Sequence, residues 1–344
     1  MICKKIKETT KMILDQEYNN KRQYERCFEK LDKLFADSRD NKFYVRVPPV
    51  QSGEEPDIYN KYGEKLRVCY MANSYLQPNS RFLYFDYLNC WLDVHFYEGI
   101  EMKRLVGNPK IRFGYIGESQ LIDKAAYEFA YNNKEILSEE LDYIFSFDEK
   151  ILNEYENARF FPLPASPWYG KALFDPINDN LYERKKKNVS IISSNKCETM
   201  LHKMRVKTAM KCRNEGLADA YGWFDGGIYL ENYDDVFTDY RYSIVIENNV
   251  SDYYFTEKLT SCFAAQTVPI YVGARKIAEF FNTDGMIVIS DDELDNIGEI
   301  LKNCNSYDYE QRRHAILDNY ERVKKYNNMW DWWYREYGQL INDC

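Results

Sequence analysis

Short apolar runs alternate with longer amphipathic stretches along most of this 344-residue chain. Runs rich in Val, Ile, Tyr and Phe are typical of buried strands, and amphipathic stretches are typical of helices. We expect strands at residues 66–72, 111–116, 143–147, 189–193, 242–246, 268–273 and 285–289. We expect helices at residues 18–35, 123–137, 200–214, 256–266, 293–304 and 307–325. This alternation predicts the α/β class with a largely parallel sheet.

Chain length and proline placement favour two domains. At roughly 150 residues per domain, a chain of this length suggests two. Three prolines within residues 161–170 exclude a regular helix there and predict a crossing between domains. We expect an N-terminal domain at residues 1–165, including a helical N-terminal segment, and a C-terminal domain at residues 166–344. A cleft between two such domains is where ligands bind in these folds.

The charge balance argues against some partners. Lys and Arg number 46 against 55 Asp and Glu, which gives a formal net charge of −9. A general nucleic-acid binder is therefore not expected, although a local basic pocket is compatible with this balance. No window holds the run of about 18 apolar residues that a membrane span needs, and the N-terminus lacks the apolar core of a secretory signal. We expect a cytoplasmic protein without a transmembrane segment, with peripheral contact at the inner face of the membrane left open.

Cysteine and histidine spacing gives no metal-site signature. The nine cysteines are scattered without a C-x-x-C pair, which is typical of reduced cytosolic thiols. The three histidines, at 95, 202 and 314, lie far apart and form no H-E-x-x-H motif. We therefore predict no metal site.

Three further segments each allow more than one interpretation. The basic run at residues 184–187 is expected to be a solvated turn before a strand. The aromatic run at residues 330–337 suits a membrane anchor, an acceptor platform or core packing. Its helical spacing favours core packing, with this last helix docking on the first domain. The Tyr-rich residues 81–97 suit either stacking on an acceptor sugar or ordinary core.

The block at residues 240–259 gives the clearest indication of a ligand-binding site. An apolar strand ends at Glu247 and Asn248, a polar loop follows, and Thr256 is a suitable N-cap for the next helix. Helix N-termini attract phosphate, and Lys258 in the first turn opposes the helix dipole, as expected of a residue kept for a ligand. The block therefore suggests a nucleotide-diphosphate site, although an ordinary capped helix is equally compatible.

Several motifs in this region and upstream resemble family 10 glycosyltransferases, the α-1,3/4-fucosyltransferases. The donor motif is matched by Ile246-Glu247-Asn248, by Tyr254-Phe255-Thr256-Glu257-Lys258 and by residues 268–273, Val-Pro-Ile-Tyr-Val-Gly. Upstream matches are Ser193-Ser194-Asn195, Arg205 in the helix that follows, the strand at residues 218–222 and the pair Gly226-Gly227. In the first half, residues 115–119 resemble the family's Glu-bearing segment.

The resemblance implies a GT-B fold, with two Rossmann-like domains facing a central cleft and GDP-fucose held mainly by the C-terminal one. It implies an inverting transfer of L-fucose from GDP-β-L-fucose to a glycan hydroxyl, α-1,3 or α-1,4 on GlcNAc. GDP-fucose is then a co-substrate, and neither a cofactor nor an obligatory metal ion is expected. Alternatives are a GT-B transferase that uses another nucleotide sugar, and a non-catalytic carbohydrate-binding protein on the same scaffold.

The resemblance also assigns roles to individual residues. Arg205 and Lys258 match the cations that bind the diphosphate, and Glu118 matches the catalytic base; without the resemblance, Glu118 would pass for an ordinary exposed residue at a strand end. The further donor-binding candidates are Glu247, Asn248, Tyr254, Thr256 and Glu257.

Overall fold

The computed structural model describes residues 65–72, 78, 80–87, 89–90, 92–167 and 181–342. Internal contacts divide the chain into two compact units. The first contains the described residues up to Ile116, together with Ala125–Ile144 and the chain from Tyr337 onward. The second contains Gly117–Lys124 and Phe145–Glu336. The predicted helix at residues 18–35 and residues 168–170 of the Pro-rich segment lie outside the described residues.

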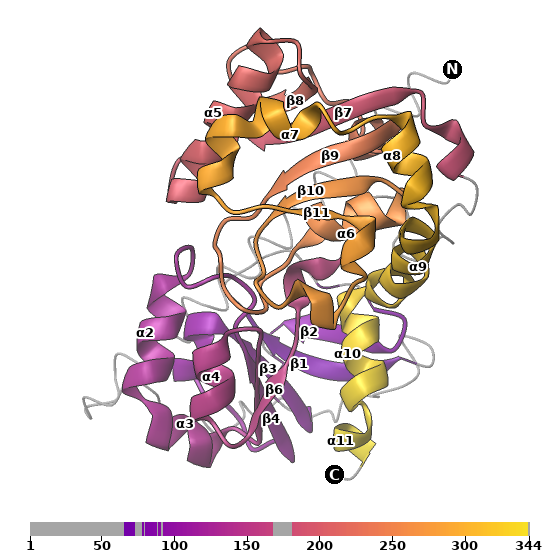
Figure 1. Cartoon of the computed structure of the whole chain (residues 1–344). Helices are drawn as coiled ribbons and strands as arrows, with labels where there is room; N and C mark the ends of the chain where they lie inside the picture. The colour runs from indigo at the N-terminus through magenta and orange to yellow at the C-terminus, as the bar shows by residue number, and fades with distance from the viewer. Residues whose placement is uncertain are drawn as a thin grey trace, which may run out of the picture. The chain divides into compact units, whose positions relative to one another are not determined.

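The first sheet has six strands in the order β2-β1-β3-β4-β5-β6 (Figure 1). Its strands are β1 (Leu66–Met71), β2 (Leu83–Tyr87), β3 (Val94–Glu98), β4 (Ile111–Tyr115), β5 (Tyr143–Ser146) and β6 (Ala158–Phe160). β1 pairs in parallel with both β2 and β3, and β3 pairs in parallel with β4. The expected strands β1, β4 and β5 are confirmed, whereas β2, β3 and β6 were not predicted.

The Tyr-rich residues 81–97 supply β2 and β3, and their apolar side chains belong to the core. Leu83, Phe85, Phe96 and Tyr97 are each at most 1% exposed. Of the two interpretations of this segment, core packing therefore holds for these four residues.

A side-chain hydrogen bond accompanies the break in the helix expected at residues 123–137. The structure has two helices there, α2 (Lys124–Asn132) and α3 (Lys134–Glu140). Between them, Asn133 donates from its side chain to the Phe129 carbonyl at 2.8 Å. Such local bonds compete with regular helix geometry, which explains the division. Downstream, α4 (Glu149–Glu154) follows its N-cap Asp148, whose carboxylate accepts from two backbone N–H groups.

The second sheet has five strands in the order β11-β10-β9-β7-β8, and every neighbouring pair is parallel. Its strands are β7 (Lys187–Ser194), β8 (Asp219–Trp223), β9 (Tyr240–Ile246), β10 (Val268–Val272) and β11 (Ile287–Val288). All five coincide with strands expected from the sequence or from the resemblance. The α/β class is therefore confirmed, with two largely parallel sheets as in a GT-B fold.

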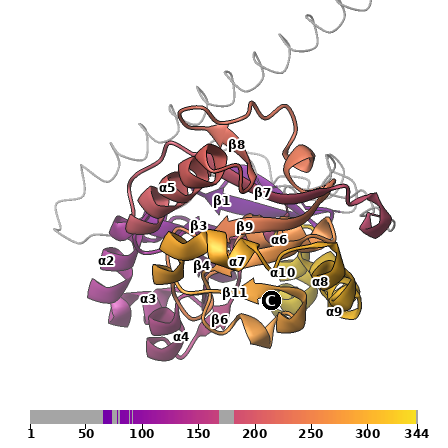
Figure 2. The same cartoon turned by 45° about the horizontal axis from the view of Figure 1, so that its top comes forward.

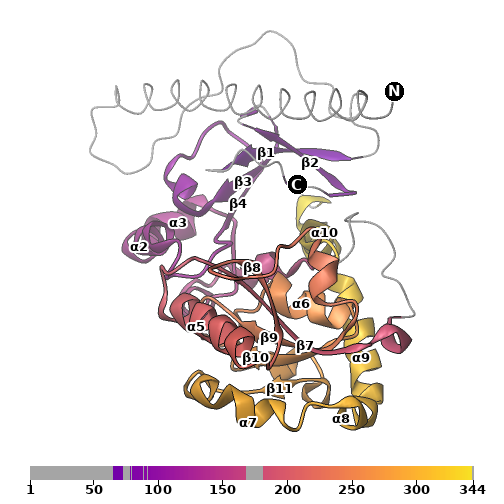
Figure 3. The ribbon, with the colours of Figure 1, turned by 90° about the horizontal axis from the view of Figure 1, so that it is seen from above.

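Helices α5 (Met200–Asn214) and α6 (Glu257–Ala264) confirm two expected helices. α5 packs on β7 and β8, and α6 packs on β9 and β10 (Figures 2 and 3). From the adjacent strands β7 and β9 the chain proceeds toward opposite edges of the sheet, so right-handed crossovers place α5 and α6 on opposite faces. The carboxyl ends of β7 and β9 thus form a topological switch point, the usual ligand position in such sheets.

The helices after β11 differ in part from those expected. In place of the single helix expected at residues 293–304, the structure has a 3-10 helix (Asp292–Asn296) followed by the short α7 (Ile297–Leu301). The helix expected at residues 307–325 is divided into α8 (Ser306–Gln311) and α9 (Arg313–Val323). The chain continues with α10 (Met329–Tyr337) and α11 (Gln339–Asn342). Among the described residues, no helix has both the length and the apolar character that crossing a membrane requires.

The basic run at residues 184–187 corrects one prediction, because Lys185 is not part of a solvated turn. Its side chain is buried, and Nζ donates to the carbonyl oxygens of Phe237, Thr238 and Ala265 and to Thr267 Oγ1, all between 2.7 and 3.0 Å. Burial lowers the pKa of Lys185 to about 7. The four acceptors satisfy the buried amine, so this lysine ties the start of β7 to the segments that flank β9 and β10.

The tryptophans of α10 pack in the core of the second unit. Trp333 is fully buried against Phe145, with ring centroids 5.4 Å apart. Trp330 and Trp332 are each less than a tenth exposed, and both contact the ring of Phe161. Of the three interpretations of this run, core packing therefore holds for its tryptophans.

Candidate functional site

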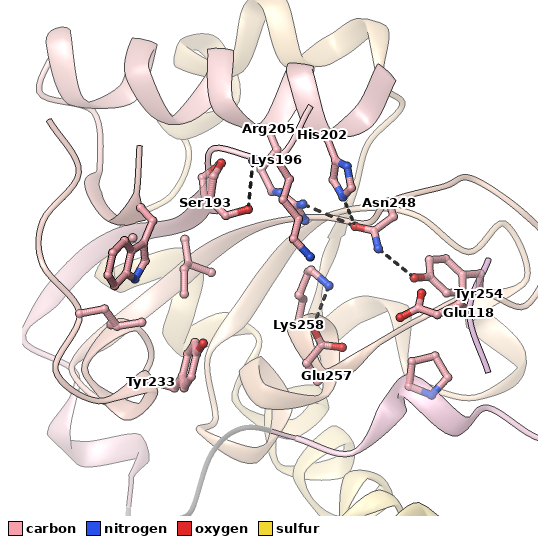
Figure 4. A pocket seen from close by; sticks show the side chains of 16 residues that line it. Glu118, Ser193, Lys196, His202, Arg205, Tyr233, Asn248, Tyr254, Glu257 and Lys258 are labelled. Atoms are coloured by element: carbon pink, nitrogen blue, oxygen red, sulfur yellow. Dashed lines mark hydrogen bonds and ion pairs between the residues drawn. The ribbon is translucent and has the colours of Figure 1, made fainter. Parts of the chain in front are cut away.

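A pocket of about 500 Å³ lies at the carboxyl ends of β7, β8 and β9, within the second unit (Figure 4). The N-termini of α5 and α6 border it, which favours an anionic ligand. Its lining consists of Glu118, Pro164, Ile192, Ser193, Ser194, Lys196, His202, Arg205, Gly222, Trp223, Leu230, Tyr233, Asn248, Tyr254, Glu257 and Lys258.

Gly222 allows the ends of β7 and β8 to approach closely at the pocket wall. Its φ of +109° lies in a region that residues with a side chain rarely adopt. A Cβ atom there would also collide with the carbonyl oxygen of Ser193. A glycine is therefore required at this point of the lining.

Arg205 reaches the pocket from the second turn of α5. Its side chain is 6% exposed, and Nη1 donates to the Ile246 carbonyl at 2.8 Å, where β9 ends. Nη2 lies 3.5 Å from Asn248 Oδ1. Because a guanidinium group has five N–H donors, these two contacts fix its plane and leave other donors for an anion.

Asn248 connects elements on both sides of the pocket. Its Oδ1 lies 2.9 Å from His202 Nε2, and its Nδ2 donates to the Tyr254 hydroxyl at 3.2 Å. Figure 4 shows His202, Asn248 and Tyr254 in one line of hydrogen bonds. The ring of Tyr254 packs on Phe147 at 5.0 Å between centroids, so only a small part of Tyr254 borders the pocket.

The start of α6 is held by a fully buried carboxylate. Thr256 is the N-cap, as predicted, and its hydroxyl accepts from the Lys258 backbone N–H at 3.3 Å. Glu247 accepts from both the backbone N–H and the hydroxyl of Thr256, each at 2.8 Å. Complete burial raises the pKa of Glu247 to about 7, and Lys258 opposes the rise. Glu247 thus fixes the helix terminus on which Lys258 is carried.

Lys258 lies among acidic and polar groups at the pocket floor. Its Nζ is 2.8 Å from Glu257 Oε1, 3.1 Å from Thr256 Oγ1 and 3.8 Å from Glu247 Oε2. The Lys258 and Glu257 side chains are each about 15% exposed. The ammonium group is therefore held at the N-terminus of α6, where the helix dipole adds to its positive charge.

Glu118 follows β4 and contributes a carboxylate to the same pocket. Its side chain is open to solvent, yet nearby protein removes part of its hydration and raises its pKa. Repulsion from Glu257 adds to the rise, while Lys258 and Lys196 oppose it. A carboxylate with a raised pKa beside a pocket suits general base catalysis.

Most of the site residues predicted from the sequence come together here. The lining includes Glu118, Arg205, Asn248, Tyr254, Glu257 and Lys258. Glu247 and Thr256 are outside the lining; each is at most 1% exposed, and they support the start of α6.

Six polar or aromatic lining residues were not among the predicted site residues: Lys196, His202, Trp223, Tyr233, and the pair Ser193-Ser194, which the resemblance includes only as part of a motif. Lys196 precedes α5 and His202 lies in its first turn. Their closeness in sequence to Arg205 is a signal that could have identified them as pocket residues. Trp223 and Tyr233 are 75% and 45% exposed. Nothing in their local sequence distinguishes them from surface residues.

Among the residues that the structure describes, no group of three or more His, Cys, Asp or Glu side chains is arranged to hold a metal ion. The pocket contains two carboxylates, Glu118 and Glu257, and three cationic side chains, Lys196, Arg205 and Lys258. With more cationic than acidic side chains, the pocket favours binding of an anionic ligand over a metal cation.

Residues 182–336 match the model of "Glycosyltransferase family 10 (fucosyltransferase) C-term". This match confirms the resemblance over that range, which contains every lining residue except Glu118 and Pro164. No curated protein matches the chain in sequence.

Similar solved structures include an α1,3-fucosyltransferase at 16% identity and a TM-score of 0.46, covering 76% of this chain and 84% of that one. An α1,3-fucosyltransferase with GDP is 14% identical, with a TM-score of 0.46 and coverage of 80% and 93%. An α1,3-fucosyltransferase with GDP-fucose is 15% identical, with a TM-score of 0.44 and coverage of 81% and 93%.

Proposed function

We propose, on the premise that residues 182–336 of this glycosyltransferase belong to family 10, that the chain transfers L-fucose from GDP-β-L-fucose to a glycan hydroxyl. The observation that carries the proposal is the joint placement of Arg205, Lys258 and Glu118 around one pocket. Two of these are cations beside helix N-termini, and the third is a carboxylate with a raised pKa.

The diphosphate of the donor binds between Arg205 and Lys258 in this proposal. Arg205 presents a planar fork of donors, and Lys258 adds a point charge at the N-terminus of α6. Their charge offsets the negative charge that develops on the departing GDP, so no obligatory metal ion is required. Asn248, Tyr254 and Glu257 contact the donor sugar or ribose, and the guanine stacks on the pocket-lining rings of Trp223 and Tyr233.

The transfer is a single displacement with inversion. Glu118 takes the proton of the acceptor hydroxyl while that oxygen bonds to C1 of fucose. The bond between C1 and the phosphate oxygen breaks, and its electron pair leaves with GDP. The β-linked donor thus gives an α-linked product, and we propose a 3- or 4-hydroxyl of GlcNAc as the acceptor.

Calorimetric titration with GDP, UDP and their sugars, followed by an acceptor panel with GDP-fucose, tests this function. We expect GDP and GDP-fucose to bind, and the product to gain one fucose by mass, with linkage analysis giving its position. A preference for UDP would support another nucleotide sugar, and binding of glycans without any nucleotide would support a non-catalytic lectin. Activity that survives chelation of divalent ions is expected, because Arg205 and Lys258 supply the positive charge.

A further inference from the structure

His202 is a buried imidazole in the lining of the donor pocket, and the proposed transfer mechanism does not use it. It is 2% exposed and lies in the first turn of α5, where its backbone N–H donates to the N-cap hydroxyl of Thr199 at 3.0 Å. Its Nε2 lies 2.9 Å from Asn248 Oδ1. The backbone and one ring nitrogen are therefore both fixed.

The neighbours of Asn248 determine which ring nitrogen carries hydrogen. Arg205 can only donate, so the atom of Asn248 that faces Arg205 is the amide oxygen. The amide nitrogen then points to the Tyr254 hydroxyl. Because the same oxygen faces His202, Nε2 must be the protonated nitrogen, and the neutral ring has a bare Nδ1.

The bare Nδ1 lies 3.3 Å from Glu198 Oε2, and it has no hydrogen-bond partner among the described residues. Two acceptors face each other there, which is unfavourable unless a proton lies between them. Burial lowers the pKa of His202, the charges of Arg205 and Lys196 lower it further, and Asn248 and Glu198 oppose the shift. Burial is thus the main cause that favours neutral His202, and Arg205 and Lys196 add a part that the proposed ligand would neutralise.

We propose that His202 is a positioning residue that orients Asn248 through its Nε2–H and takes up a proton on Nδ1, beside Glu198, when a nucleoside diphosphate binds. The inference rests on the proposed function, since the anion it requires is the diphosphate of the donor. The two negative charges of a bound diphosphate offset those of Arg205 and Lys196, so imidazolium becomes favourable and Nδ1–H donates to Glu198.

Substitution by glutamine separates the two parts of this role. The side-chain amide of His202→Gln can donate to Asn248 from about the position of Nε2, but it does not titrate near neutral pH. His202→Asn is the matched control, because its shorter amide reaches only about as far as Nδ1. His202→Ala removes both functions.

The experiment is calorimetric titration of GDP at about pH 7, in two buffers of different ionisation enthalpy, which gives the number of protons exchanged on binding. The terminal phosphate of GDP itself exchanges protons, because the second pKa of a phosphate is about 6, and His202→Gln corrects for that exchange. We expect the wild type to take up more protons than His202→Gln. We expect Gln to keep GDP affinity within about threefold, and Ala and Asn to lose about 10-fold, as for one lost buried hydrogen bond.

Equal proton numbers for the wild type and His202→Gln, with GDP bound by both, would overturn the proton uptake. Equal GDP affinity for His202→Gln, Asn and Ala would overturn the positioning of Asn248. Absence of GDP binding to the wild type would instead refute the proposed function, so the two failures are distinct.

Discussion

The ammonium group of Lys258 lies 2.8 Å from the carboxylate of Glu257, within the pocket lining and one residue along the same helix. Lys258, the cation assigned to the diphosphate, is thus oriented by Glu257, whose carboxylate also lines the pocket. Removing the lysine alone would leave an unpaired carboxylate beside the phosphates.

Lys258→Met should therefore weaken GDP binding by about 30-fold and lower turnover as well, because a charge-assisted contact is lost and Glu257 then repels the phosphates. The double variant Lys258→Met/Glu257→Gln should bind GDP more tightly than Lys258→Met. Calorimetry with GDP measures both, and the exposed Lys302→Met is the matched control. Unchanged GDP affinity in Lys258→Met would contradict the phosphate role.

Glu118→Gln should abolish most of the turnover, by a factor on the order of 100 to 10,000, and leave GDP-fucose binding nearly unchanged. The amide cannot accept the acceptor proton, but it occupies the same space. Because the pKa of Glu118 is raised, the wild-type rate should increase with pH through a value above that of an ordinary glutamate. Fucose transfer measured against pH tests this dependence, and exposed Glu128→Gln is the control. Near wild-type turnover in Glu118→Gln would exclude the base assignment.

The helix cap and the strands that the sequence predicted correctly depend on residues adjacent in the sequence. Thr256 is followed by a first-turn glutamate and an apolar helix face, so its capping role can be recognised from adjacent residues. β7, β9 and β10 of the second sheet contain apolar runs rich in Val and Ile, and α5 and α6 pack on this sheet from opposite faces. Motif resemblance then added Arg205 and Glu118, whose proximity to Lys258 no local pattern reveals.

The burial of Lys185 and Glu247, which the sequence did not predict, depends on contacts between residues far apart in the sequence. Lys185 stands in a run of four basic residues, and its acceptors come from segments more than 50 residues away. The burial of Glu247 depends likewise on the packing of α6 against β9 and β10. Hydrophobic periodicity describes one helix or strand at a time, so it cannot predict contacts between elements that are distant in the sequence.

Lys185→Met should lower the free energy of unfolding by about 3 kcal/mol, because four oxygen acceptors, in three buried contacts and one partly buried contact, lose their donor. Urea unfolding at about pH 6 measures the loss, at a pH where the wild-type amine is charged. The neighbouring exposed Lys186→Met is the matched control and should change stability by less than about 0.5 kcal/mol. Equal effects of the two substitutions would show that the Lys185 contacts do not stabilise the fold.

Glu247 should make stability fall as pH rises. Its folded pKa of about 7 lies above the value of about 4.3 in an unfolded chain, so the folded protein binds more protons between these values. The free energy of unfolding therefore decreases through this window, by up to about 4 kcal/mol, and the cost is fully present above about pH 8.

Glu247→Gln removes this titration and one acceptor of Thr256, so the variant should be less stable than the wild type at about pH 5. The deficit should shrink or reverse by about pH 8, where the wild type buries a charged carboxylate. Urea unfolding at both pH values measures the change, with exposed Glu215→Gln as the control. A deficit of the same size at both pH values would mean that Glu247 is already ionised at the lower pH, held so by Lys258 and by the two donors of Thr256.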